Sequence, residues 1–301
     1  SKYMALCQVI KYFYMNINKL TLTSSDYPAI LRELKSAPKQ LYHTGSPLTD
    51  LLARPRVTIV GSRKVSIYGE RATREFASQL AEQGVVIISG LASGVDVIAH
   101  QSAIEAGGIC IAVLPSPLDN IVPVANRPLA KNILDNSGAL ISEYSLGEFP
   151  QKQNFIARNR IMAGLGQVVL ITDASQKSGS LHTSRFALEQ GITVMCVPGR
   201  IYDQSHTGSN NLLKSGALVA TSVDDVLHNL GLVRHQTIVK QVRGRNKNEQ
   251  TLLDLMLLGV TEGEVLLERS RLGVSQFNQA LTMLEIGGKI RALGANNWAI
   301  S

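Results

Sequence analysis

Two stretches of the chain join an apolar run directly to a glycine turn: Val57-Thr58-Ile59-Val60-Gly61-Ser62-Arg63 and Val85-Val86-Ile87-Ile88-Ser89-Gly90-Leu91-Ala92-Ser93-Gly94-Val95-Asp96. Each run is short and rich in valine and isoleucine, and a segment with helical spacing follows it, over 68–83 and 96–106. A buried strand, a turn and a helix in succession are typical of a parallel sheet with helices packed on it. The two stretches therefore predict an α/β fold.

The same alternation continues along the chain, with a further helical segment at 181–190. Right-handed crossovers place such helices on both faces of the sheet and bring the carboxyl ends of the strands to one edge, where ligands bind. We therefore expect a Rossmann-like, doubly wound, mostly parallel sheet over residues 25–232. The predicted strands are Val57–Val60, Val85–Ile88, Cys110–Leu114, Ala139–Ile141, Val168–Ile171, Thr193–Val197 and Ala217–Ala220.

The chain changes character after Leu232. Residues 233–248 carry five basic side chains and no acidic one, which indicates a basic linker. Residues 249–301 then predict a small winged-helix-like domain, built from three helices and a hairpin. The helices are expected at Gln250–Leu258, Thr261–Arg269 and Ser275–Ile286, with Ser275 as the cap of the third, and the hairpin strands at Lys289–Leu293 and Trp298–Ile300.

Composition places these domains in a broad class. The 301 residues suffice for about two domains, and 45% hydrophobic with 18% charged residues is typical of a globular protein. No apolar run approaches the ~20 residues of a membrane span, so no membrane insertion is expected. Three scattered cysteines indicate the cytoplasm rather than a disulfide framework. The chain has no CxxC or HExxH, so no metal is predicted. Residues 1–24 are predicted to be an N-terminal extension, and Met15 is an alternative natural start.

Several of the predicted strand-to-helix turns suit an anion, in keeping with a net charge of +7. Glycine turns and helix N-termini expose backbone N–H groups, and an arginine adds a fork that fits phosphate. Asp96 is expected to brace its loop, and His100 to be structural. The dinucleotide fingerprint GxGxxG is absent, so no cofactor is predicted. The candidate binding residues are Gly61, Ser62, Arg63, Ser89, Gly90, Gly94, Asn126, Arg127, Phe155, Arg158, Asn159, Arg160, Ser178, Gly179, Ser180 and Thr183.

Two of these assignments have structural alternatives. Arg158 or Arg160 could instead pair with Glu143 or Asp173. Phe155 could belong to the core, or it could be a platform on which bases stack.

Taken in order, the motifs resemble those of the DprA/Smf family of bacterial DNA-processing proteins. They are Gly61-Ser62-Arg63, Ser89-Gly90-x-Ala92-x-Gly94-x-Asp96, Arg158-Asn159-Arg160-Ile161-x-Ala163-Gly164-Leu165, Ser178-Gly179-Ser180-Leu181-x-Thr183 and Pro198-Gly199…Ser205-x-x-Gly208-x-Asn210. The resemblance covers about residues 25–230. Small departures from the family pattern occur at Val122, Ala125, Asp173 and Ser184. Few residues precede Tyr27, so we expect a short form without the N-terminal helical domain of some members.

The resemblance implies a protein that binds single-stranded DNA without cutting it, and therefore not an enzyme. Such a protein protects incoming strands and loads the RecA recombinase during natural transformation. It implies RecA, single-strand binding protein and a second copy of the chain as partners. Arg63 and Arg127 are the first choices for phosphate contacts, and Arg158, Arg160 and the glycine turns come next.

Other functions remain open from the sequence. A related class of Rossmann-like proteins hydrolyses nucleoside monophosphates with a Pro-Gly-Gly-x-Gly-Thr loop and a following glutamate. Here Ser178–Thr183 lacks the double glycine, and Glu189 is the glutamate that follows. A nucleotide-sensing scaffold is a third possibility. In the tail, four basic against six acidic residues, with none basic in 275–286, favour protein contact over tight DNA binding.

Overall fold

The computed structural model describes residues 17–233 and 244–300, except 258 and 295. Within it the chain divides after His235 into two compact units, which are described separately below. Cys7, Met15 and much of the predicted basic linker lie outside the described residues.

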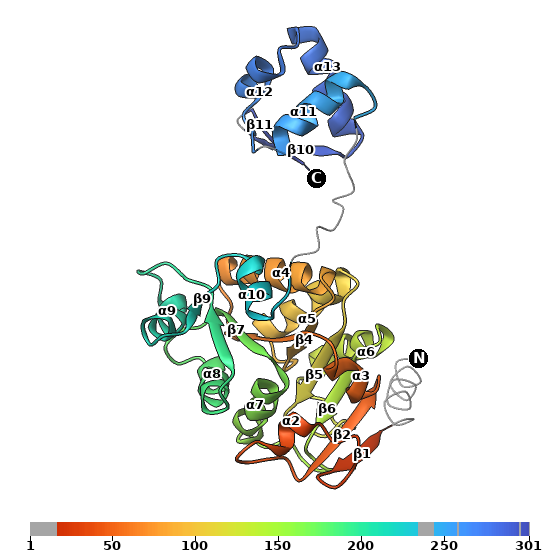
Figure 1. Ribbon diagram of the computed structural model, residues 1–301, viewed down its shortest axis with the longest axis vertical. Helices are drawn as coiled ribbons and strands as arrows, with labels where there is room; N and C mark the ends of the chain where they lie inside the picture. Colours follow the sequence, from red (N-terminus) through yellow and green to blue (C-terminus); the bar gives the residue numbers. More distant parts are fainter. Residues whose placement is uncertain (1–16, 234–243, 258, 295, 301) are drawn as a thin grey trace. The chain divides into compact units, whose positions relative to one another are not determined.

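The larger unit is built on a nine-stranded sheet in the order β1-β2-β6-β5-β4-β3-β7-β8-β9 (Figure 1). The seven strands from β3 to β9 in chain order are all parallel to one another, whereas β2 pairs antiparallel with both β6 and β1. In chain order they are β1 (Asn18–Thr21), β2 (Gln40–Gly45), β3 (Arg56–Gly61), β4 (Val86–Ser89), β5 (Cys110–Leu114), β6 (Ala139–Ser142), β7 (Val168–Asp173), β8 (Thr193–Cys196) and β9 (Leu218–Val219).

All seven predicted strands are present, and the α/β, mostly parallel architecture is confirmed. Strands β1 and β2 were not predicted from the sequence. Their sequences, Asn-Lys-Leu-Thr and Gln-Leu-Tyr-His-Thr-Gly, carry no run of valine or isoleucine. Strand β1 lies within the stretch assigned to the N-terminal extension, so the sheet begins before residue 25.

Helices cover both faces of the sheet, because the strand side chains point alternately to two separate apolar clusters. Val57 and Ile59 of β3 pack in one cluster and Val60 in the other. The first cluster is closed by α4 (Ile67–Glu82), α5 (Val95–Glu105), α6 (Arg127–Asp135) and α10 (Val223–Asn229). The second is closed by α2 (Ala29–Arg32), α3 (Leu48–Leu52), α7 (Asn154–Leu165), α8 (Ser180–Glu189) and α9 (Thr207–Lys214).

The order of the strands locates the point at which the chain reverses direction across the sheet. From β3 the chain adds β4, β5 and β6 successively on one side, and it then returns to place β7 on the other side of β3. In open α/β sheets the carboxyl ends of the two strands at such a reversal flank a crevice in which ligands bind. The fold therefore points to the ends of β3 and β7, at Gly61 and Asp173.

The smaller unit contains three helices and a two-stranded antiparallel sheet around its own apolar cluster, which includes Leu252, Leu266, Phe277 and Leu284. Its elements are α11 (Lys247–Leu257), α12 (Gly263–Ser270), α13 (Val274–Ile286), β10 (Ile290–Gly294) and β11 (Asn297–Ile300). The prediction that Ser275 caps the third helix is wrong. That helix begins at Val274 after Gly273, whose extended backbone makes it the N-cap without a side-chain bond.

None of the helices in the described part of the chain combines the length and the apolar character that a bilayer crossing requires.

Candidate functional site

A pocket of about 440 Å³ opens where the sheet reverses, between the carboxyl ends of β3 and β7. Its walls come from the loop after β3, the loop after β4, helix α7, and the loop and first turn that lead into α8. Ten of the candidate binding residues line it: Gly61, Ser62, Arg63, Phe155, Arg158, Asn159, Ser178, Gly179, Ser180 and Thr183. Motifs more than 100 residues apart in the sequence therefore meet in one site.

Ser89, Gly90 and Gly94 support the pocket instead of lining it. The Ser89 hydroxyl donates to the Ile59 carbonyl at 2.7 Å inside the sheet. A Cβ on Gly90 would clash with the Arg158 guanidinium, so only glycine leaves room for that group. Gly94 has a φ of +82°, and a side chain there would collide with the Ser62 carbonyl. These positions allow the neighbouring loops to approach one another.

Three further candidates do not line the pocket, because each has a partner elsewhere. Asn126 donates to the Leu91 carbonyl at 2.8 Å, and Arg127 donates to the Ile121 carbonyl at 3.1 Å. Arg160 makes a two-pronged ion pair with Glu143, with N–O distances of 2.8 and 2.6 Å. Arg160 is thus the arginine that pairs with Glu143, as the structural alternative anticipated.

The floor of the pocket holds two buried ionisable side chains, Asp96 and Arg158, which are 6% and 3% exposed. The Arg158 guanidinium donates to the carbonyls of Gly90, at 2.7 Å, and Val113, at the ends of β4 and β5. Burial raises the pKa of Asp96, and Arg158 opposes that shift. Burial lowers the pKa of Arg158 to about 10, so the guanidinium stays charged at neutral pH. Asp96 also accepts from the Ala92 amide at 3.3 Å, which is the bracing role expected of it.

The rim of the pocket carries exposed cations. Arg63 and Lys64 follow β3, and Lys177 follows β7. The Arg63 guanidinium lies 5.0 Å from the centre of the half-buried Phe155 ring, a distance at which a cation and an aromatic face attract. Phe155 lines the pocket and belongs to neither apolar cluster of the described sheet unit. Sequence analysis missed Lys64 and Lys177; their only signal was their place beside the glycine turns.

The N-terminus of α8 forms the remaining wall. Gly179 is its N-cap. The N–H of Ser180 donates to the Ser178 hydroxyl at 3.4 Å, and those of Leu181 and His182 donate to the carbonyls of Ser178 and Gly179. The hydroxyls of Ser178 and Ser180 are 2.8 Å apart. The fully buried Thr183 hydroxyl has no hydrogen-bond partner among the residues that the structure describes. The dipole of the helix favours an anion at this end.

Fold and site together define a Rossmann-like protein whose pocket, at the reversal of a parallel sheet, is suited to phosphate groups. Residues 18–231 match the family model of DNA recombination-mediator protein A. The chain belongs to this family, the DprA/Smf family of DNA-processing proteins, which are recombination mediators.

Individual relatives agree with this membership. Protein Smf of Escherichia coli is 40% identical over 220 residues, which are 73% of this chain and 58% of that protein. DNA processing protein DprA of Streptococcus pneumoniae is 42% identical over 201 residues, 67% of this chain and 70% of that protein. The matched segment thus spans little more than half of the E. coli relative.

Two solved structures are similar as well. The X-ray structure of S. pneumoniae DprA has a TM-score of 0.67 and 37% identity, over 75% of this chain and 77% of that one. The second is a structure of DNA processing protein A from Helicobacter pylori, reported for its single-stranded DNA binding mode. It has a TM-score of 0.64 and 33% identity, over 72% of this chain and 97% of that one.

Proposed function

We propose that this protein binds single-stranded DNA through the pocket between β3 and β7, without reading its sequence. The observation that carries the proposal is the combination of Arg63, Lys64 and Lys177 with the Phe155 ring at one rim. Cations and helix N-termini hold phosphates of any strand, and an aromatic face stacks on any base. The similarity to H. pylori DprA, whose structure was reported for its single-stranded DNA binding mode, supports the same ligand for this protein.

Within this site the residues divide into direct and supporting roles. The three rim cations, Arg63, Lys64 and Lys177, contact phosphates of the strand. The first turn of α8, together with Ser178 and Ser180, binds a further phosphate. Arg158 and Asn159 form the floor. Gly90, Gly94 and Ser89 keep the loops in place, and Arg127 and Arg160 act outside the pocket through their own partners.

We further propose that the protein acts in the cytoplasm as a recombination mediator and not as an enzyme. It would protect incoming DNA in competent cells and help load RecA during natural transformation. A second copy of the chain, RecA and single-strand binding protein are the proposed partners. Membership of a family of recombination mediators supports this role.

For the C-terminal unit we propose a winged-helix domain with a protein-contact role. Its three helices and antiparallel hairpin have the outline of that fold. Helix α13, which occupies the place of a recognition helix, contains no lysine or arginine. A helix that enters the major groove needs basic side chains to reach phosphates, so this unit is better suited to a protein surface.

Nucleotide hydrolysis is less well supported. Glu189 lies at the far end of α8, where its carboxylate pairs with Arg185 at 2.9 Å. Asp96 is the one acid among the described residues that line the pocket, and Arg158 already compensates its charge. Hydrolysis needs a general acid or base that is free to move a proton at the substrate, and neither side chain meets that condition.

A band-shift titration of the full chain tests the proposal. Labelled single-stranded and duplex oligonucleotides of the same sequence are compared across a range of salt concentrations. The slope of the logarithm of the binding constant against the logarithm of the salt concentration measures the phosphates neutralised, at ~0.7 per phosphate for single strands. Three rim cations therefore predict a slope of about −2. Arg63→Ala is expected to weaken binding to every sequence alike. The control is Arg185→Ala, an exposed residue of α8 that does not line the pocket.

The outcomes separate the candidate functions. A slope near zero, or equal binding of duplex, contradicts the proposal. A loss confined to some sequences indicates base readout. Release of base from nucleoside monophosphates would favour the hydrolase, and tighter binding of mononucleotides than of oligonucleotides would favour the nucleotide-sensing scaffold.

A further inference from the structure

The Pro198-Gly199…Asn210 motif lies outside the pocket, yet it bonds to one of the loops that carry the rim cations. One rim loop, residues 62–66, presents Arg63 and Lys64, and the other, residues 174–178, presents Lys177. Neither loop has regular secondary structure to fix it over most of its length. Their positions therefore depend on what holds their ends.

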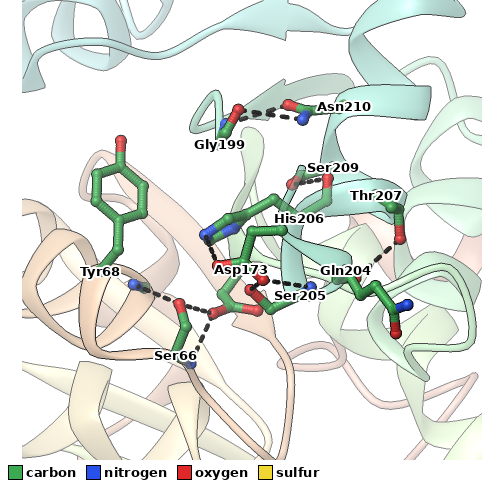
Figure 2. Close-up of polar contacts among 12 residues, drawn as sticks. Ser66, Tyr68, Asp173, Gly199, Gln204, Ser205, His206, Thr207, Ser209 and Asn210 are labelled. Carbon is green, nitrogen blue, oxygen red and sulfur yellow. Dashed lines mark hydrogen bonds and ion pairs between the residues drawn. The ribbon is translucent and has the colours of Figure 1, made fainter. Parts of the chain in front are cut away.

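Asp173, the last residue of β7, holds both ends of the first loop, and Figure 2 shows its contacts with Ser66 at one of these ends. Its backbone carbonyl accepts from the Ser62 amide at 2.8 Å. Its carboxylate Oδ2 accepts from the Ser66 amide at 2.9 Å and from the Ser66 hydroxyl at 2.7 Å. Asp173 is fully buried, and a Cβ on Gly69 would clash with its carboxylate. The segment that contains Arg63 and Lys64 is thus fastened at each end to one residue.

The first turn of α9 holds the second loop. The amides of Gly208 and Ser209 both donate to the Ala174 carbonyl, at 2.8 and 3.1 Å. The Thr207 hydroxyl accepts from the Gln176 amide at 3.1 Å. A Cβ on Gly208 would collide with the Ser175 carbonyl. Lys177 and Ser178 follow directly, so α9 sets where they begin.

The rest of the motif ties α9 to α4. The Asn210 amide exchanges two hydrogen bonds with the Gly199 backbone, both at 3.1 Å. The buried His206 ring packs beneath Gly199 and meets the Tyr68 ring edge-on, with ring centres 5.3 Å apart. The Tyr68 hydroxyl donates to the Pro198 carbonyl at 3.0 Å. Figure 2 shows the Tyr68 and His206 side chains and the two bonds between Gly199 and Asn210.

We infer that Asp173 and the Thr207–Ser209 turn are positioning residues, which fix the two cationic loops at the separation at which both engage one strand. This inference rests on the proposed single-stranded DNA binding. A loop that is already ordered loses little conformational freedom when it binds, so preorganisation appears as affinity. If either loop is released, its cations no longer contact phosphate together with those of the opposite loop.

The variants are chosen to release one loop at a time. Asp173→Ala removes the acceptor that holds Ser66. Asp173→Asn keeps an acceptor oxygen on a side chain of the same length. Gly208→Ala displaces the second loop from the other side. The control is Ser142→Ala: Ser142 is equally buried and also makes two hydrogen bonds at the end of a strand, but it does not line the pocket.

The readout is the salt dependence of single-strand binding by the full chain. A merely destabilised protein has fewer active molecules but the same slope, because the slope counts phosphates neutralised per complex. We expect Asp173→Ala and Gly208→Ala to bind about tenfold more weakly, which corresponds to ~1.4 kcal/mol. Their slopes should be shallower by about 0.7, the value for one phosphate. Asp173→Asn and Ser142→Ala should keep the wild-type slope.

The result that overturns the inference is a wild-type slope in both Asp173→Ala and Gly208→Ala, or an equal change in Ser142→Ala. If Asp173→Ala does not fold, Gly208→Ala decides. Failure of the proposed function itself is distinct, because the wild-type protein would then show no salt-dependent binding of single strands, and both ideas would fall.

Discussion

Replacing Arg158 by methionine should destabilise the sheet unit strongly. The guanidinium is almost completely buried and bonds to the carbonyls of Gly90 and Val113 and to Asn159. Methionine fills similar space but removes the charged donor from the Gly90 and Val113 carbonyls. A hydrogen bond from a charged group contributes about 1.5–3 kcal/mol, so loss of these two should lower the free energy of unfolding by about 3–6 kcal/mol. In a unit of this size that corresponds to a fall in Tm of roughly 6–24 °C.

The chain contains its own internal control for this measurement. Its single tryptophan, Trp298, lies in β11 of the small C-terminal unit. Far-UV circular dichroism reports mainly on the larger sheet unit, whereas tryptophan fluorescence reports on the small one. In Arg158→Met the dichroism transition should move to lower temperature while the fluorescence transition stays in place.

A second substitution tests the electrostatic cause. In Arg158→Met the Asp96 carboxyl loses the charge that opposes the rise of its pKa, so Asp96→Asn should cost less stability in that background than in the wild type. A coupling free energy of about 0.5–3 kcal/mol is expected for residues in one network. The reasoning is refuted if the single variant melts with the wild type, or if the double variant is less stable than the sum of the two single changes predicts.

Three further predictions concern single side chains. Lys177→Ala should weaken binding to all single strands alike and make the log–log salt slope shallower by about 0.7, as measured by band-shift titration. Phe155→Leu should cost about 1–3 kcal/mol of binding free energy at an unchanged slope, because it removes a stacking face and no charge. Burial lowers the pKa of His100 from 6.5 to about 3, so its contribution to stability is present above pH 6.5 and is lost as the pH falls. Urea unfolding at pH 7 and pH 5 should therefore show the wild type losing up to ~1.4 kcal/mol per pH unit relative to His100→Asn.

The fold was largely predictable because buried parallel strands leave a strong local signal. Runs such as Cys110–Leu114 are apolar on both faces, and β5 has the predicted bounds. The antiparallel strands β1 and β2 have no run of valine or isoleucine, and polar residues such as His43 and Thr44 of β2 weaken the signal further. Which strands become neighbours depends on tertiary packing, and the sequence indicated only that the parallel strands share one edge.

The parts of the site formed by local backbone turns were predictable from the sequence, whereas the directions in which the long side chains point were not. Glycine turns such as Gly61 and Gly179 are visible in the sequence because the backbone itself does the work. Where an arginine points depends on partners outside its own helix: Glu143 holds Arg160 across 17 residues, and Asn120 and Ile121, in the loop before α6, hold Arg127. The exposed Lys64 and Lys177 have no local signature beyond their place beside the glycine turns.

The distribution of charge explains why such a pocket would ignore sequence. Arg158 is buried and donates to two backbone carbonyls, and Arg160 is paired with Glu143, so neither guanidinium is free to meet a phosphate. Arg63, Lys64 and Lys177 have no ion pair within the described residues, and all three are exposed. A strand is therefore drawn to the rim, where its phosphates meet cations, and not into the floor, where base edges could be read. Charge removed from the rim should weaken every complex equally, whereas charge removed from the floor should act first on folding.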